Sequence, residues 1–347
     1  EILQLHNFPL LFVGPTGTGK SVYTMTKLAS GLPEEYNNMV VTFSAQTSAN
    51  QTQDIIDGKL DKRRKGVFAP PLGKRMIIFV DDLNMPMVEE YGAQPPIEIL
   101  RQYMDHDGWF DRKECTFRKL IDIQFMAAMG PPGGGKSFVT ERYLRHFNHI
   151  SVTEFDDNTM IRIFETIQTW YFTVANQFVG DVAKLSGKLV TATLEVYQAV
   201  IKEMLPTPTK SHYVFNLRDF ARVHAGICMA KPDQIDNPEK AIRLWIHETY
   251  RVFYDRLVDH KDREWFYEHT RNALKDGFGK AMDKVFAHLD ADGDGNIDMD
   301  EMDQMMFGNF ANPDKRVLDE VTDFEAMQTM VEEYLSDYNS VSKTPLP

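Results

Sequence analysis

The sequence contains few cysteines and fewer basic than acidic residues, and both facts limit what the protein can be. Its 347 residues include 2 cysteines, Cys115 and Cys228, which lie far apart in the chain. So few cysteines exclude a disulfide framework and favour a reducing compartment. Basic residues are also in the minority, since 38 Lys and Arg stand against 51 Asp and Glu, for a formal net charge of −13. A nucleic-acid-binding surface needs a basic field, so we expect no nucleic-acid partner.

Long apolar runs are missing as well. The sequence holds no apolar stretch of the roughly 20 residues that a membrane-spanning helix needs, so we expect no membrane partner. The first residues, beginning at Glu1, show no charged-then-apolar signal pattern, and a core strand follows within a few residues. We therefore expect the chain to be a piece of a longer protein. Its hydrophobic content of 43% is enough for more than one core.

The strongest motif is a phosphate-binding loop near the N-terminus. The pattern G-x-x-x-x-G-K-[ST] is matched completely by Gly14, Pro15, Thr16, Gly17, Thr18, Gly19, Lys20 and Ser21. An apolar segment precedes the loop and a helix-compatible segment follows it, which is the context of a genuine nucleotide site. Glycines let backbone N–H groups turn toward phosphate oxygens, and the helix N-terminus adds positive potential. We expect Lys20 to reach the β- and γ-phosphates and Ser21 to ligate Mg²⁺.

A second motif complements the loop. The apolar run 76–80 ends in Asp81 and Asp82, as a Walker B strand does. Asp81 is expected to hold the Mg²⁺ shell, because a hard cation prefers carboxylate oxygen. Asp82 stands where many ATPases place a carboxylate that orients or activates water.

The order of apolar segments predicts an α/β domain followed by a helical one. Expected strands cover residues 10–13, 39–43, 76–80, 121–129 and 150–153. Long connections separate them, which favours a mainly parallel sheet with helices on both faces. The basic run 61–65 is expected to be a solvated loop, and the alternative is a site that touches a neighbouring module. From Asp157, which with Asn158 is expected to cap a helix, apolar residues recur at helical spacing. Further helices are expected over 188–205, 218–228 and 239–261.

Residues 290–301 match the twelve-residue EF-hand calcium loop at every defining position. The expected Ca²⁺ ligands are Asp290, Asp292, Asp294, Asn296, Asp298 and Glu301. We find no second such loop in the sequence, and an unpaired loop usually binds less tightly. The methionines of the leaving segment would make a sensor if Ca²⁺ exposed them, and a purely structural insertion is an equal alternative. They are Met302, Met305 and Met306.

Residues 130–137 also satisfy the P-loop pattern. Pro131 and Pro132 stiffen this stretch and remove backbone donors that a phosphate cradle needs. No strand ending in Asp follows at a suitable distance, so we do not expect a second phosphate site here.

Several longer strings resemble the third AAA+ module of axonemal dynein heavy chains. They are residues 11–21, 43–48, 59–68, 79–86, 91–98, 145–148 and 215–220. The resemblance extends over nearly the whole chain. An EF-hand inside this module is similar to one subgroup, the single-headed inner-arm heavy chains.

The resemblance implies a P-loop AAA+ parallel-sheet domain followed by an α-helical lid subdomain that carries the EF-hand. It divides the chain into a large subdomain, a lid, the EF-hand insertion and a helical continuation toward the next module, at residues 1–153, 154–270, 271–312 and 313–347. It implies ATP or ADP, Mg²⁺ and Ca²⁺ as ligands. It also implies a regulatory site within an ATP-driven microtubule motor of the cytoskeleton, in the axoneme of a cilium or flagellum. Implied partners are neighbouring AAA+ modules of the same heavy chain, the microtubule through the stalk, and dynein intermediate and light chains.

Residue roles follow from the same resemblance. Arg218 matches the sensor-2 arginine of the lid, and Arg142 matches an arginine finger that serves the preceding module. Gly130 falls where many AAA+ modules place a polar sensor-1 residue. Asp82 replaces the usual glutamate, and positioning errors of about 1 Å can cost about 10²-fold in rate. Lys136 and Ser137 stand where the family more often has Arg and Asn.

Three alternatives to a regulatory nucleotide site remain open from the sequence. The first is a self-sufficient P-loop ATPase. The second is a structural module that binds nucleotide and Ca²⁺ without hydrolysis, which Asp82 and Gly130 favour. The third is a calcium-responsive interaction module in which the nucleotide is structural.

Overall fold

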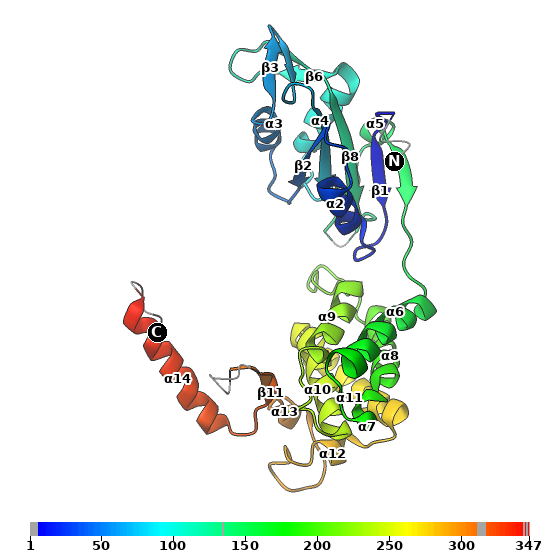
Figure 1. Cartoon of the computed structure of the whole chain (residues 1–347), viewed down its shortest axis with the longest axis vertical. Coiled ribbons are helices and arrows are strands. Elements are labelled where there is room, and N and C mark those ends of the chain that lie inside the picture. The colour runs from blue at the N-terminus through cyan, green and yellow to red at the C-terminus, as the bar shows by residue number, and fades with distance from the viewer. Residues whose placement is uncertain (1–5, 134, 311–316, 343, 345, 347) are drawn as a thin grey trace. The chain divides into compact units, whose positions relative to one another are not determined.

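The computed structural model of the chain describes residues 6–133, 135–310, 317–342, 344 and 346 (Figure 1). The chain folds as two compact units, Glu1–Glu154 and Phe155–Pro347. The first is an α/β unit and the second is largely helical. Among the described residues, no helix has the length and apolar character to cross a membrane.

A five-stranded parallel sheet forms the centre of the first unit. Its strand order is β2-β5-β8-β1-β9. The strands are β1 (Leu10–Val13), β2 (Tyr36–Thr42), β5 (Arg75–Asp81), β8 (Ile123–Met129) and β9 (Asn148–Ser151). The predicted parallel sheet is confirmed, although β8 begins two residues later than expected and β9 begins two residues earlier.

Alternate side chains of the inner strand β5 enter two separate cores. Ile77 and Phe79 belong to one cluster and Ile78 to the other, and all three are fully buried. Leu28 of α2 packs in the first cluster, whereas Ile56 of α3 packs in the second. The sheet is therefore covered on both faces, which explains its continuous apolar strands. The helices of this unit are α2 (Lys20–Ser30), α3 (Ala49–Asp57), α4 (Pro95–His106) and α5 (Glu141–Leu144).

A second, four-stranded sheet was not anticipated. Its order is β3-β4-β7-β6, from strands β3 (Asp61–Arg64), β4 (Val67–Ala69), β6 (Gly108–Phe110) and β7 (Phe117–Leu120). The prediction of a loop over 61–65 is therefore wrong. A hairpin forms because Gly66, at φ 73°, takes the turn conformation that only glycine adopts without cost. The charged side chains remain mostly exposed on this edge strand, where they discourage pairing with another chain.

The second unit is a helical bundle. Its longer helices are α6 (Asp157–Trp170), α8 (Ser186–Glu203), α9 (Leu217–Ile227), α10 (Pro238–Val252) and α11 (His260–Phe278). Shorter elements are the π-turn η1 (Tyr171–Ala175), α7 (Gly180–Ala183), the 3-10 turn η2 (Tyr254–Arg256), α12 (Met282–Val285), α13 (Met299–Met302) and the strands β10 (Phe307–Gly308) and β11 (Asp319–Glu320). The helix expected after Asp157 is confirmed, but its cap is Asp156, whose carboxylate accepts from the Thr159 N–H at 3.3 Å.

The single helix predicted over residues 239–261 is wrong, because the chain turns between α10 and α11. Phe253, Tyr254 and Leu257 are all buried at this turn. The apolar periodicity therefore continues across the turn, so the sequence pattern alone does not show where α10 ends. Asp259 begins the next helix as its N-cap residue.

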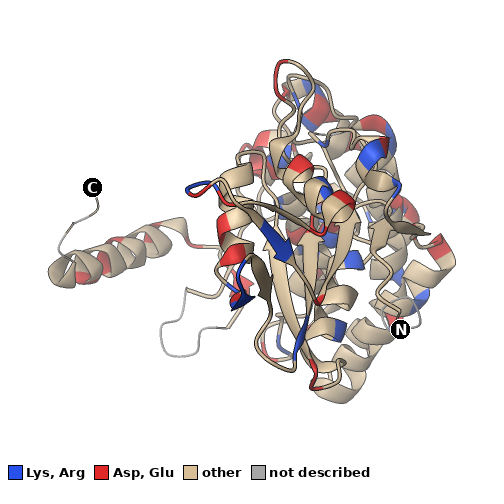
Figure 2. Ribbon diagram, turned by 90° about the horizontal axis from the view of Figure 1, so that it is seen from above, with Lys and Arg blue, Asp and Glu red and all other residues tan. Residues whose placement is uncertain are grey.

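The last helix, α14 (Phe324–Val341), has every side chain at least partly exposed. Its charged positions are all acidic, as Figure 2 shows along its length.

Candidate functional site

The loop 14–19 connects the end of β1 to the start of α2. Gly17 and Gly19 have φ angles of 91° and 84°, in the left-handed region that favours glycine. Gly14 is required for another reason, since a Cβ there would lie 2.1 Å from the carbonyl oxygen of Val152. The close approach of the chain after β9 thus fixes the beginning of the loop. The structure therefore has the strand, the glycine-rich turn and the helix N-terminus that the sequence predicts.

Lys20 lies over this loop. Its ammonium donates to the carbonyl oxygens of Gly14 at 2.7 Å and Pro15 at 2.6 Å. The Thr18 hydroxyl lies 3.2 Å from the same ammonium and itself donates to the Pro15 carbonyl. The cation is therefore held at the centre of the loop, the place where a P-loop lysine meets phosphate oxygens.

Ser21 and Asp81, the two expected Mg²⁺ ligands, lie side by side. The Ser21 hydroxyl donates to the Asp81 carboxylate at 2.7 Å. Asp81 is the last residue of β5 and is 9% exposed. A hydroxyl and a carboxylate oxygen at one point match the hard oxygen ligands that Mg²⁺ takes beside a nucleotide. The residues present thus fit Mg²⁺.

Asp82 follows at the carboxyl end of β5, with a φ angle of 52°. Its backbone N–H donates to the Asp81 carboxylate at 3.1 Å. Its own carboxylate faces the ammonium of Lys136 at 3.4 Å. The sequence does not predict this partner, since 54 positions separate the two residues and no local pattern links them.

The second P-loop-like stretch has a different conformation. Gly133 and Lys136 exchange backbone hydrogen bonds of 3.0 and 3.1 Å, and the Ser137 N–H donates to the Asn84 carbonyl. These backbone donors are used within the protein. No helix begins at Lys136 as α2 does at Lys20: among the described residues the next helix is α5, which begins at Glu141. The geometry agrees with the expectation that this stretch is no phosphate cradle.

The two predicted arginines are both exposed. Arg142 lies on α5 in the first unit, and Arg218 is the second residue of α9 in the second unit. The Arg218 backbone N–H donates to the Asn216 side chain at 2.9 Å, so the arginine begins a well-capped helix. The first unit brings together Lys20, Ser21 and Asp81.

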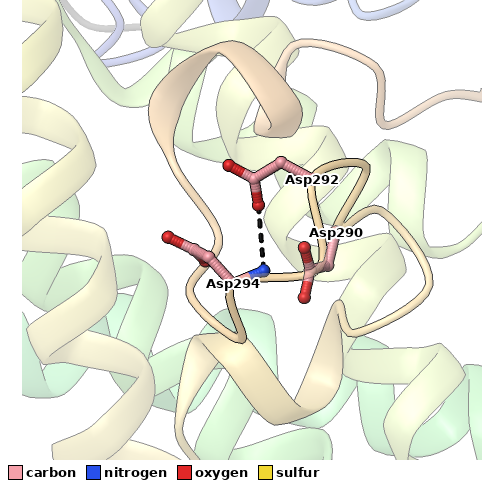
Figure 3. Close-up of side chains that lie close together, drawn as sticks. All are labelled: Asp290, Asp292 and Asp294. Carbon is pink, nitrogen blue, oxygen red and sulfur yellow. Dashed lines mark hydrogen bonds between the residues drawn. The ribbon is translucent and has the colours of Figure 1, made fainter.

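The predicted calcium loop gathers acidic side chains. Ligand atoms of Asp290, Asp292 and Asp294 lie within 4.8 Å of one another (Figure 3). Asp290 accepts from the Gly293 and Gly295 N–H groups at 2.6 and 3.0 Å, which curls the loop around its first position.

The end of the calcium loop is ordered by its own glutamate. The Glu301 carboxylate accepts from the Ala291 N–H at 2.8 Å and the Asp298 N–H at 3.1 Å. Glu301 thus joins both ends of the loop, and its oxygens fit a Ca²⁺ donor set.

The sequence did not predict the contacts that hold position eight of this loop. The Ile297 N–H donates to the Asp283 carboxylate at 3.1 Å, and the Ile297 carbonyl accepts from the Tyr267 hydroxyl. Asp283 also forms an ion pair with Arg271 at 2.9 Å. Met302 and Met305 are buried in the lid core, and the flanking helices α12 and α13 are short.

Two family models match the chain. One, described as P-loop containing dynein motor region, covers residues 1–155, and the other, described as AAA+ lid domain, covers residues 189–288. Fold and matches together define a dynein-type AAA+ module, a P-loop sheet domain followed by its helical lid. Curated relatives specify it further.

Mouse dynein axonemal heavy chain 3 is 47% identical over 98% of this chain, and mouse dynein axonemal heavy chain 12 is 48% identical over 96%. Mouse dynein axonemal heavy chain 1 is 45% identical over 99%. The chain belongs to the axonemal dynein heavy-chain family, which places it in the axoneme. It spans 8% of the length of heavy chains 3 and 1 and 11% of heavy chain 12.

Proposed function

We propose that this chain is a regulatory AAA+ module that binds ATP or ADP with Mg²⁺. The observation that carries the proposal is the contact of Ser21 with Asp81, because it joins the phosphate loop to the Walker B strand. The loop 14–21 would hold the phosphates, with Lys20 at the β- and γ-phosphates. Bound Mg²⁺ would neutralise phosphate charge, held by Ser21 and Asp81.

The proposed role is regulatory because the hydrolytic groups are incomplete. Asp82 is one methylene shorter than glutamate, and its carboxylate already faces an ammonium. Gly130 has no side chain with which to orient water. Arg218 would read the γ-phosphate from the lid, and Arg142 would serve the preceding module. Nucleotide here would then bias the main hydrolysis site of the whole protein by coupling between sites.

The place in the whole protein is proposed by family likeness. We place the module third in the motor ring of a single-headed inner-arm heavy chain, an ATP-driven microtubule motor. Its partners would be the neighbouring AAA+ modules, the microtubule through the stalk, and intermediate and light chains. The division into a large subdomain, a lid, an EF-hand insertion and a continuation is part of the same proposal, with the boundary after residue 270 inside α11.

Calorimetric titration with Mg-ATP, followed by product analysis of the same sample, tests this function. We expect binding with ATP recovered intact, and loss of binding in Lys20→Ala, because the loop then lacks its cation. Lys59→Met, an exposed lysine of the same unit, is the matched control and should bind normally. Clear ADP production without a partner module would instead establish a self-sufficient ATPase.

A second candidate function is Ca²⁺ binding at residues 290–301. The specific observation in its favour is the support of position eight by Asp283 and Tyr267. In EF-hands this backbone position makes a short strand contact. Here Asp283 and Tyr267 supply the hydrogen bonds at this position in place of a second loop. An unpaired loop is thereby shaped for its ion. Because Tyr267 lies on α11, Ca²⁺ bound there would stabilise the lid.

Calcium titration calorimetry of the whole chain tests the second function. Glu301→Gln should abolish Ca²⁺ binding, since it removes the bidentate charge. Glu332→Gln on the exposed helix α14 is the control and should leave it unchanged. Binding that persists in Glu301→Gln would contradict the site. A nucleotide affinity that changes with Ca²⁺ would favour the calcium-responsive interaction module, and an unchanged affinity would favour a structural loop.

A further inference from the structure

Gly130 lies at the carboxyl ends of the parallel strands, where the nucleotide site is formed. It directly follows β8, and β8 lies between β5, which ends in Asp81, and β1, which leads into the phosphate loop. Because the carboxyl ends of parallel strands meet at one edge, a side chain at position 130 would stand between the two motifs. Glycine leaves this central position without a side chain of its own.

Lys136 fills the space that Gly130 leaves. A Cβ built at Gly130 would lie 2.7 Å from the Lys136 ammonium and 3.1 Å from its Cδ. The Lys136 side chain is 14% exposed, so most of its length is packed within the unit. The lysine therefore reaches back across the turn and brings a positive charge to the place of the missing side chain.

Asn84 fixes both ends of this turn. Its amide donates to the Gly130 carbonyl at 2.8 Å, and its backbone carbonyl accepts from the Ser137 N–H at 2.9 Å. Asn84 is itself buried, at 1% exposure, just beyond β5. Since Asn84 is two residues after Asp82, the turn that carries Lys136 is tied directly to the segment that carries the carboxylate.

The Lys136 ammonium ends beside Asp82, with 3.4 Å between Nζ and the carboxylate oxygen. The Asp82 side chain is 45% exposed, so this contact alone contributes little to stability. An ammonium has three donors and binds phosphate well as a point charge. Its position, beside Asp82 and at the end of the strand between β5 and β1, suits the far end of a triphosphate.

We propose that Lys136 supplies the polar group that Gly130 lacks: it positions Asp82 and recognises the terminal phosphate of a nucleoside triphosphate, so that the site distinguishes ATP from ADP. This inference rests on the proposed nucleotide function and adds, to the proposed role of Arg218, a group of the sheet domain itself that contacts the γ-phosphate. It also gives a physical meaning to the glycine, whose missing Cβ makes room for the lysine.

The test compares the affinities of ADP and the non-hydrolysable ATP analogue adenylyl imidodiphosphate, both with Mg²⁺, by calorimetry. Lys136→Met should weaken the analogue about tenfold, as loss of a charge-assisted hydrogen bond does, and change ADP less than twofold. Lys136→Arg keeps the cation and should retain the preference. Lys59→Met is the control that should behave as wild type.

Gly130→Ala provides a second, independent variant. Its Cβ would displace the ammonium without removing the lysine, so the preference for the triphosphate should fall here as well. An unchanged ratio of the two affinities in Lys136→Met would overturn the inference and leave nucleotide binding intact. Equal loss of both ligands would make Lys136 a structural residue and overturn it too. A wild-type chain that binds neither ligand would contradict the proposed function itself, and the inference with it.

Discussion

The Ser21 hydroxyl donates to the Asp81 carboxylate at 2.7 Å, and 60 positions of sequence separate the two residues. Ser21 is the second residue of α2, whereas Asp81 ends β5. The phosphate loop and the Walker B strand are therefore joined directly. This contact brings two oxygen ligands to one point beside Lys20, and every proposal about the nucleotide depends on it.

The two neighbouring aspartates should behave differently on substitution. Asp82→Asn should leave Mg-ADP affinity within about threefold, because Asp81 rather than Asp82 contacts Ser21. Calorimetry of the purified variant measures this directly. A loss of binding as complete as that of Lys20→Ala would show that Asp82 itself holds the nucleotide complex.

The first glycine of the loop should be essential for stability as well as for binding. In Gly14→Ala the new Cβ would lie 2.1 Å from the Val152 carbonyl oxygen, which is backbone and cannot simply turn aside. We expect a destabilisation of about 3 kcal/mol, at the upper end of overpacking effects. Urea unfolding measures it.

Gly73→Ala is the matched control for Gly14→Ala. Gly73 has a φ angle of 79°, but a Cβ there would meet nothing within 4 Å. Only backbone strain remains, worth about 1 kcal/mol. Equal destabilisation by the two variants would show that the contact with Val152 is unimportant.

The architecture of the nucleotide domain was predictable from local patterns, and the second sheet was not. The core strands are continuous apolar runs that end in recognisable motifs, and β1 was predicted with its observed bounds. Strand β3 instead consists of four charged residues, Asp61–Arg64, and pairs with the adjacent strand β4, which in turn pairs with the distant strand β7. Tertiary pairing there overrides the weak local signal.

Thr193 should stabilise the lid through a buried hydrogen bond. Its hydroxyl accepts from the Trp245 indole N–H at 2.9 Å, and both side chains are fully buried. Thr193→Val keeps the volume but leaves the indole unsatisfied, so we expect a loss of about 1–3 kcal/mol. Thermal unfolding followed by tryptophan fluorescence checks this. Thr191→Val, on the exposed face of α8, should cost under about 0.5 kcal/mol, and a similar loss there would contradict the explanation.

His224 should make the lid sensitive to acid. Burial lowers the pKa of His224 from an ordinary 6.5 to about 3 in the folded chain. The unfolded chain therefore binds the proton more readily. The contribution of His224 to the free energy of unfolding is fully present above about pH 6.5. It falls by about 1.4 kcal/mol per pH unit as the pH drops toward 3.

The pH slope of unfolding free energy should identify this histidine. His224→Asn removes the titration, so the stability of the variant should vary less steeply between pH 6 and 4 than that of wild type. Urea unfolding at several pH values gives both slopes. Identical slopes would mean that His224 is protonated without unfolding the lid.

Tyr267 should tune Ca²⁺ affinity without touching the ion. Tyr267→Phe removes the donor to the Ile297 carbonyl, so the loop loses support at position eight. We expect Ca²⁺ affinity to fall about fivefold, as for one lost neutral hydrogen bond. Calcium calorimetry measures it, with Tyr338→Phe on the exposed face of α14 as control. An unchanged affinity in Tyr267→Phe would separate the lid from calcium binding.

The sequence identified the motif residues of the candidate sites but not the residues that support them. The phosphate loop and the calcium loop are contiguous, so their spacing alone predicts their ligands. Lys136 meets Asp82 across 54 positions, and Tyr267 meets Ile297 across 30. Such contacts follow from the path of the chain, and a lysine or tyrosine has no local signature for them.

The Mg²⁺ dependence of ATP binding tests the central claim most directly. Calorimetric affinities of ATP for wild type and Asp81→Asn, each with and without Mg²⁺, give four values. If Ser21 and Asp81 hold the ion, Mg²⁺ should strengthen binding to wild type at least about tenfold and Asp81→Asn by about twofold at most. The same Mg²⁺ enhancement in both proteins would contradict the account.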